Sequence, residues 1–215
     1  MPSNRACRIA LIFLSAASIG GCVPGATGPF MSPPTIRASD VGTGEPKRER
    51  RMGGDISVTY APNGAELLTF GGDIRVRQAS GFVAASTFGG EIVVDSLASG
   101  GRFVAHGGDV QLTLTSSSTP RDVSIKVLGG NVELQLPGTA SARIDIRMAY
   151  GRDGRGFHRI DTPFPLKQSE PSEWRREVLH GFRYRQHVDA SGVVGGGKDR
   201  ITIHVEDGSV TLRKG

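Results

Sequence analysis

The stretch Gly71-Gly72-Asp73-Ile74-Arg75-Val76 is one copy of a phrase that recurs along the chain. In each copy a glycine pair is followed by an acidic or amide residue and then by an aliphatic residue. The copies begin at Gly53, Gly71, Gly89, Gly107 and Gly129, first at steps of 18 residues and then at a step of 22. A fixed period of about 20 residues is typical of proteins in which each repeat stacks on its neighbour.

Apolar and polar residues alternate after each glycine pair, which is the pattern of a half-buried strand. The side chains expected to face inward are Ile56, Val58, Ile74, Val76, Ile92, Val94, Val110, Leu112, Leu114, Val132, Leu134 and Leu136. A second strand leads to the next glycine pair, where glycine permits a tight corner with positive φ. We therefore expect an all-β fold, a single β-solenoid of stacked 18–22-residue coils with two strands per coil.

The residue before each glycine forms a second series along the chain. Its members are Phe70, Phe88, His106, Leu128 and Tyr150. Stacking in chain order predicts that these side chains form one mostly aromatic and apolar column, because like positions of neighbouring coils lie about 4.8 Å apart.

After Gly151 the repeat is interrupted by an excursion, residues 152–194, in which the spacing predicts one short helix from Ser172 to Gly181. Aromatic side chains suit sugar rings, and Arg suits carboxylate or phosphate. The candidate binding residues are Trp174, Arg175, Arg176, Phe182, Arg183, Tyr184 and Arg185. The alternative is that the excursion covers or caps the open strand edges, and the two roles are compatible. The repeat pattern returns after the excursion, and residues 207–212 are a final degenerate copy of the phrase.

Residues 1–21 carry a short basic region and an apolar run that is too short to span a bilayer as a helix, as in a secretory signal peptide. The sequence Ile19-Gly20-Gly21-Cys22 resembles a bacterial lipobox, which implies cleavage before Cys22 and lipidation of that cysteine. The alternative is an ordinary signal peptide whose cleavage site falls near a cysteine. Residues 22–52 are rich in Pro, Gly, Ser and Thr, and are expected to form a disordered tether to a domain at 53–215. We expect a cell-envelope protein held outside the cytoplasmic membrane by its lipid. In a two-membrane bacterium, Val23, which stands where Asp would retain the protein at the inner membrane, favours the outer membrane.

The formal net charge of +5 is mildly basic and falls short of a nucleic-acid-binding footprint. A charge run, Lys47–Arg51, ends the tether. It is either a solvated segment or a contact for anionic lipid or wall polymer. The two cysteines, Cys7 and Cys22, both precede the repeats, so no disulfide is expected within the domain.

Acidic residues recur at one repeat position, so that stacking would place their carboxylates in a column. These residues are Asp55, Asp73, Glu91 and Asp109. Such a column is a candidate Ca²⁺ site, because this ion takes several oxygen ligands. The alternative, which we favour, is that each side chain accepts backbone N–H groups at its corner. No histidine has metal-ligand spacing, and we expect no cofactor.

The motifs together resemble the bacterial adhesin-like β-solenoid family, a domain class of unknown function. The resemblance covers residues 53–215 and rests on the glycine-pair phrases, Val132–Gly138, Thr162–Leu166, Gly195-Gly196-Gly197 before Ile201–Ile203, and Asp207–Leu212. The chain departs from the family at residues 151–154, where the family continues as a strand.

The family has no established catalytic residues. The resemblance therefore implies a non-catalytic envelope lipoprotein, adhesin-like or a scaffold, whose partner is an envelope glycan or another envelope protein. One alternative is a polysaccharide-acting enzyme, because β-solenoids also host such enzymes and use paired carboxylates. The other alternative is a component of an envelope-stress sensor.

Overall fold

The computed structural model describes residues 44–151, 158–177 and 183–215, all within one compact unit of the chain, Pro33–Gly215. A second unit, Met1–Ser32, lies outside the described residues. The described residues form seventeen strands and no helix. The strands are β1 (Lys47–Arg51), β2 (Ile56–Ala61), β3 (Ala65–Thr69), β4 (Ile74–Ala79), β5 (Val83–Thr87), β6 (Ile92–Leu97), β7 (Gly101–Ala105), β8 (Val110–Leu114), β9 (Asp122–Leu128), β10 (Val132–Leu136), β11 (Ala142–Gly151), β12 (Ile160–Asp161), β13 (Lys167–Gln168), β14 (Arg175–Glu177), β15 (Arg183–Val194), β16 (Asp199–Glu206) and β17 (Val210–Lys214).

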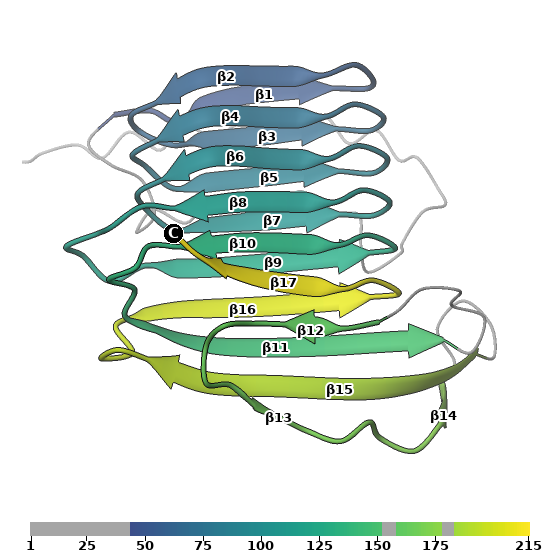
Figure 1. The fold of residues 1–215 in the computed structure, drawn as a ribbon. Helices are drawn as coiled ribbons and strands as arrows, with labels where there is room; N and C mark the ends of the chain where they lie inside the picture. The colour runs from purple at the N-terminus through teal and green to yellow at the C-terminus, as the bar shows by residue number, and fades with distance from the viewer. Residues whose placement is uncertain (1–43, 152–157, 178–182) are drawn as a thin grey trace, which may run out of the picture. The chain divides into compact units, whose positions relative to one another are not determined.

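The strands form two sheets, here named sheet A and sheet B (Figure 1). Sheet A has ten strands in the order β1-β3-β5-β7-β9-β16-β11-β15-β13, with β14 also paired to β15. Sheet B has seven strands in the order β12-β17-β10-β8-β6-β4-β2. From β1 to β10 the chain alternates between the sheets, and each strand pairs in parallel with the strand two places later. A sheet-A strand together with the sheet-B strand that follows it is called a strand pair below.

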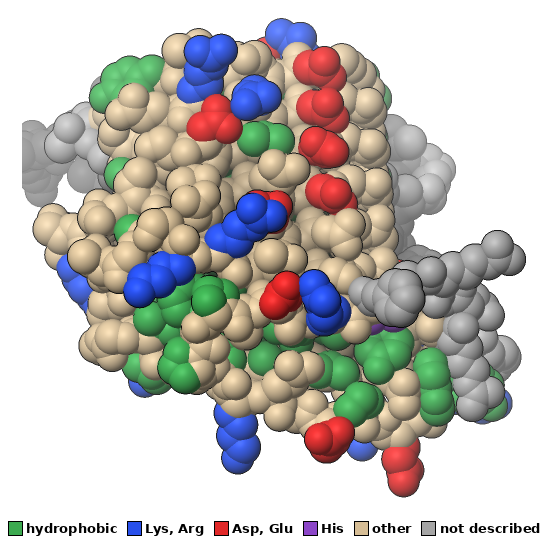
Figure 2. All heavy atoms as spheres, in the orientation of Figure 1, with side chains coloured by type: hydrophobic (Ala, Val, Ile, Leu, Met, Phe, Trp, Pro, Cys, Tyr) green, Lys and Arg blue, Asp and Glu red, His purple; other side chains and the backbone are tan. Residues whose placement is uncertain are grey.

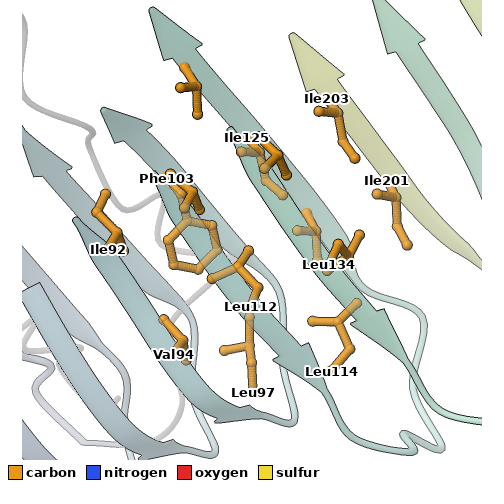
Figure 3. Close-up of a cluster of buried hydrophobic side chains, with 14 of the residues drawn as sticks. Ile92, Val94, Leu97, Phe103, Leu112, Leu114, Ile125, Leu134, Ile201 and Ile203 are labelled. Atoms are coloured by element: carbon orange, nitrogen blue, oxygen red, sulfur yellow. The ribbon is translucent and has the colours of Figure 1, made fainter. Parts of the chain in front are cut away.

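Apolar side chains from both sheets form one core cluster, part of which is drawn in Figure 3. Along sheet B the register places Ile56, Ile74, Ile92, Val110 and Val132 in one row. All the side chains expected to face inward are at most 2% exposed. The predicted all-β class and the period-2 alternation are therefore confirmed.

In most pairs the second glycine is required for a different reason from the one predicted. Positive φ occurs in these pairs only at Gly54 and Gly129. At Gly72, Gly90 and Gly108, a Cβ atom would clash with the backbone of the corresponding glycine one strand pair earlier. In these three pairs the constraint is thus close approach of two backbones, whereas Gly54 in the first pair has free space and a positive φ. The first glycine has more room: a Cβ atom at Gly71 would meet nothing within 4 Å, and one at Gly107 would come no closer than 3.2 Å to the backbone.

The last strand pair, β16–β17, does not lie at the end of the stack. β16 lies between β9 and β11, and β17 lies between β10 and β12, as the yellow strands in Figure 1 show. The expectation that repeats stack in chain order is therefore wrong at this point. The degenerate copy at residues 207–212 leads into β17, which pairs with β10, so that Val210 lies beside Val132. A pattern of like repeats does not specify which neighbour each repeat takes.

A buried ion pair fixes the inserted strand pair. Nε of Arg121, just before β9, donates a hydrogen bond of 2.7 Å to Oδ2 of Asp199, the first residue of β16. Nη1 of Arg121 also donates to the carbonyls of Thr115 and Leu97. The two charged side chains are 3% and 8% exposed, so water does not screen their interaction.

The charge run of residues 47–51 forms a strand, β1, which pairs with β3. It falls within the segment 22–52 for which a disordered tether was expected, so the ordered domain starts before residue 53. The register places Lys47, Glu49 and Arg51 beside buried positions of β3, over the end of the apolar core. Glu49 forms ion pairs with both cations, at 3.8 Å to Lys47 and 2.6 Å to Arg51. Charges facing inward on an edge strand discourage the addition of a further strand.

At the other end of sheet A, the excursion pairs with the edge of β11. β15 runs antiparallel to β11, from Val194 beside Ala142 to Arg185 beside Gly151. β13 and β14 then pair with β15. The helix expected from Ser172 to Gly181 is wrong within its described part, because residues 175–177 form β14.

Gly90→Ala is expected to lower the free energy of unfolding by about 1–3 kcal/mol, because its methyl group would overlap the Gly72 carbonyl. Gly71→Ala is the matched control, since this glycine has free space and no positive φ. The control should leave stability unchanged or raise it by up to about 1 kcal/mol. Urea unfolding of both variants measures the difference, and equal effects would contradict the close-approach explanation.

Asp199→Ala is expected to cost about 3–5 kcal/mol of stability, because it leaves the Arg121 guanidinium buried without its counter-charge. Glu133→Ala is the control. Glu133 of β10 pairs at 2.9 Å with Arg213 of β17, at the same junction between the strand pairs β9–β10 and β16–β17, but both side chains are more than 40% exposed. Loss of this exposed pair should cost at most about 1 kcal/mol. Thermal or urea unfolding compares the two, and a small cost for Asp199→Ala would show that the junction does not depend on the buried pair.

Candidate functional site

The carboxylates that follow the glycine pairs accept hydrogen bonds from the backbone of the next strand pair. Oδ1 of Asp55 accepts a hydrogen bond of 2.9 Å from the backbone N–H of Asp73, and Oδ1 of Asp73 accepts one of 2.9 Å from Glu91. Oδ1 of Asp109 accepts from the N–H of Asn131 at 2.7 Å. The column of acidic side chains is visible in Figure 2. These bonds agree with the interpretation that the acids accept corner N–H groups.

The same series of side-chain to backbone hydrogen bonds continues across the inserted strand pair, β16–β17. Oδ1 of Asn131 accepts from the N–H of Ser209 at 3.1 Å, and Oδ1 of Asp207 accepts from the N–H of Gly151 at 2.9 Å. Among the described residues, no group of three or more His, Cys, Asp or Glu side chains is placed to hold a metal ion. The Ca²⁺ alternative for Asp55, Asp73, Glu91 and Asp109 therefore has no geometric support within the described part of the chain.

The predicted aromatic column forms over three strand pairs. The rings of Phe70 and Phe88 stack at 4.9 Å, and those of Phe88 and His106 at 4.3 Å, each within 5° of parallel. The column does not continue to Tyr150 as predicted, because β16 intervenes and Glu206 lies beside Leu128.

Two of the predicted binding residues of the excursion interact with other parts of the fold. Trp174 lies edge-on to Tyr150, with ring centroids 6.3 Å apart, and Tyr150 in turn stacks on His158 at 4.6 Å. Arg185 donates from Nη1 to Oε2 of Glu206 at 2.6 Å and pairs with Asp207 at 3.4 Å. Trp174 and Arg185 thus have contacts within the fold, which is what a cover requires.

The remaining candidates are only partly described. Arg175 and Arg176 are exposed on β14, and Tyr184 on β15 is 48% exposed. The side chain of Arg183 lies outside the described residues. The same is true of all of Phe182 and of the predicted lipidation site, Cys22.

A cationic row that the sequence did not single out lies on the outer face of sheet A. The register places Lys126 of β9 beside His204 of β16, and His204 beside Arg147 of β11. The three side chains come together because β16 is inserted between β9 and β11. The period-2 pattern shows that they face outward, but their adjacency follows from the insertion and has no signal in the sequence.

The cationic row borders a shallow hollow of about 280 Å³. Its other lining residues are Val127, Met148, Ala149, His187, Val205 and Glu206. Partial burial lowers the pKa of His204 below 6.5, and the neighbouring positive charges of Arg147 and Lys126 lower it further. Asp189 and Glu206 raise this pKa but do not reverse the shift. The imidazole therefore favours its neutral form between two cations.

A second hollow, of about 260 Å³, also lies over β9 and β16. Its described lining residues are Phe82, Gly101, Arg102, Asp122, Ser124, Arg200 and Thr202. Ser124 and Thr202 precede Lys126 and His204 by two positions on β9 and β16, so they face the same side of sheet A. The two hollows thus follow one another along the strands of a single face.

No helix in the described residues is long and apolar enough to cross a membrane. No family model, curated protein or solved structure matches the chain.

Asp73→Ala is expected to lower the free energy of unfolding by about 1 kcal/mol, because the N–H of Glu91 loses its acceptor. Asp73→Asn keeps an oxygen at this position and should lose less. Thermal unfolding with and without Ca²⁺ measures both effects. A Ca²⁺-dependent rise in the midpoint that the Asp73→Asn substitution abolishes would instead establish the acidic column as a metal site.

Proposed function

We propose that the domain is a β-solenoid that acts as a non-catalytic binding module at the bacterial cell envelope. The observation that carries this proposal is the in-register, parallel stacking of strand pairs in two sheets. Such stacking presents side chains at a regular spacing of about 4.8 Å across an extended face. A face of this kind suits a long ligand with repeating units, and we propose an envelope glycan.

The proposed cellular location rests on the N-terminal sequence. In this proposal Cys22 carries the lipid anchor, which attaches the chain to a membrane; in a two-membrane bacterium, Val23 favours the outer membrane. Two or three acyl chains hold a protein at a membrane far more firmly than one. The segment between Cys22 and β1 is then the tether, and it lets the domain stand away from the lipid surface.

The bonding of the corner carboxylates supports binding in preference to hydrolysis. A glycan-cleaving enzyme needs two carboxyl groups aimed at one glycosidic bond. Asp55, Asp73 and Asp109 instead accept backbone N–H groups of the next strand pair. The resemblance to the adhesin-like β-solenoid family supports the same proposal, as an adhesin-like module or as a scaffold.

The proposal is tested with the full chain and an isolated envelope-glycan fraction. We expect the protein to sediment with the glycan at a saturable ratio, without release of reducing ends over time. Release of reducing or unsaturated ends that disappears in the Asp73→Asn variant would establish the enzyme alternative and overturn the proposal. Saturable capture of an envelope protein, with no retention by glycan, would exclude glycan as the partner.

A further inference from the structure

We propose that the outer face of sheet A binds an acidic polysaccharide, whose carboxylate groups occupy the hollow bordered by Lys126, His204 and Arg147. This inference deepens the proposed function, on which it rests, by naming the ligand class and its site. The neighbouring hollow beside Arg102 and Arg200 takes a second acidic unit of the same polymer.

The cationic row is built by backbone register and does not depend on long side chains reaching toward one another. Lys126, His204 and Arg147 stand at directly paired positions of three adjacent parallel strands. Neighbouring strands are about 4.8 Å apart, so Lys126 and Arg147 flank the imidazole on both sides. A carboxylate above His204 is then within reach of two cations and one imidazole nitrogen.

The charges around the hollow favour an anion. Glu206 lines the hollow, but its carboxylate is held by the Arg185 guanidinium at 2.6 Å. Asp189 of β15 is paired in register with Arg147 and lies beyond it, one strand further from His204. Ala149, with its short side chain, lies between Glu206 and His187 and leaves space at the floor of the hollow.

Two hollows on one face favour a polymer over a single small anion. Arg102 and Arg200 border the second hollow together with Asp122, which lies beside Arg200 in register, so the two cations exceed the one acid, and the hollow shares β9 and β16 with the first. Two residues along a strand span about 7 Å. An extended chain lying along β9 and β16 therefore meets cations at both hollows, and simultaneous contacts raise its affinity above that of one unit.

His204 makes the binding dependent on pH. The groups that face it are Lys126 on β9, Arg147 on β11, His187 and Asp189 on β15, and Glu206 on its own strand. Without ligand, burial and the two cations hold the pKa of His204 below 6.5. A bound carboxylate favours the imidazolium, so it raises this pKa, and by linkage the affinity for the carboxylate increases as pH falls.

The test uses the full chain and a short oligomer of galacturonate as the probe, with titration calorimetry as the measurement. We expect saturable binding that weakens with added salt. Arg147→Gln should weaken it about tenfold, the effect of losing one charge-assisted hydrogen bond. Arg147 is exposed, so this substitution should leave the fold intact, which the unfolding midpoint checks.

Arg75→Gln is the matched control. Arg75 is also a strand arginine with an exposed side chain, but it lies on sheet B, where it pairs with Asp95 at 3.4 Å. Its substitution should leave the affinity for the probe unchanged. In the wild-type chain, the NMR signals of the His204 imidazole should titrate at higher pH with the probe than without it. His204→Gln should remove the increase in affinity at low pH.

The possible results distinguish failure of the proposed site from failure of the proposed function. If Arg147→Gln and Arg75→Gln bind the probe equally well, the proposed site is wrong. If the probe does not bind but the envelope glycan does, this inference fails and the proposed function stands; if neither binds, both fail. A neutral glucose oligomer of equal length should not bind, and its binding would contradict a charge-based site. Equal binding of polyphosphate would show a general polyanion surface and overturn the assignment to carboxylates.

Discussion

Parallel backbone pairing between strands of like pattern is the interaction on which this structure depends. At one corner it brings the strand pairs so close that the second glycine of the later phrases, from Gly72 to Gly130, has no room for a side chain. The same corner carries acids whose oxygens accept the N–H of the next strand pair, so the ladder of bonds continues where the strands end. Glycine and acid in the recurring phrase therefore serve one purpose, which is to let backbones stack closely with their polar groups satisfied.

A stack of parallel strands has two ends, and in sheet A the two edges are protected in different ways. At one end of sheet A, the charged strand β1 places Lys47, Glu49 and Arg51 over the apolar core and pairs their charges. At the other end, the excursion supplies β15 as an antiparallel partner for β11. Both devices limit the addition of further strands, one through charge and the other by occupying the edge.

The insertion of β16–β17 links the architecture to the candidate site. Because β16 lies between β9 and β11, it completes the core, and its Asp199 forms the buried pair with Arg121. The outer face of the same strand carries His204, which thereby comes between Lys126 and Arg147. The insertion of β16 between β9 and β11 therefore determines both the buried ion pair that stabilises this part of the fold and the charge pattern of the face that we propose as a binding site.

The sequence by itself determined the strand class, the inward side chains and the positions of the corners, because these depend on short-range alternation and on glycine spacing. It also identified the acidic column, and it favoured the hydrogen-bonding role that the structure shows for three of its members. The order of the last strand pairs, the role of β1 as an edge and the cationic row were decided by tertiary structure. The physical reason is that equivalent repeats offer equivalent surfaces to one another, so a local pattern shows that a strand will pair but not which strand it will pair with.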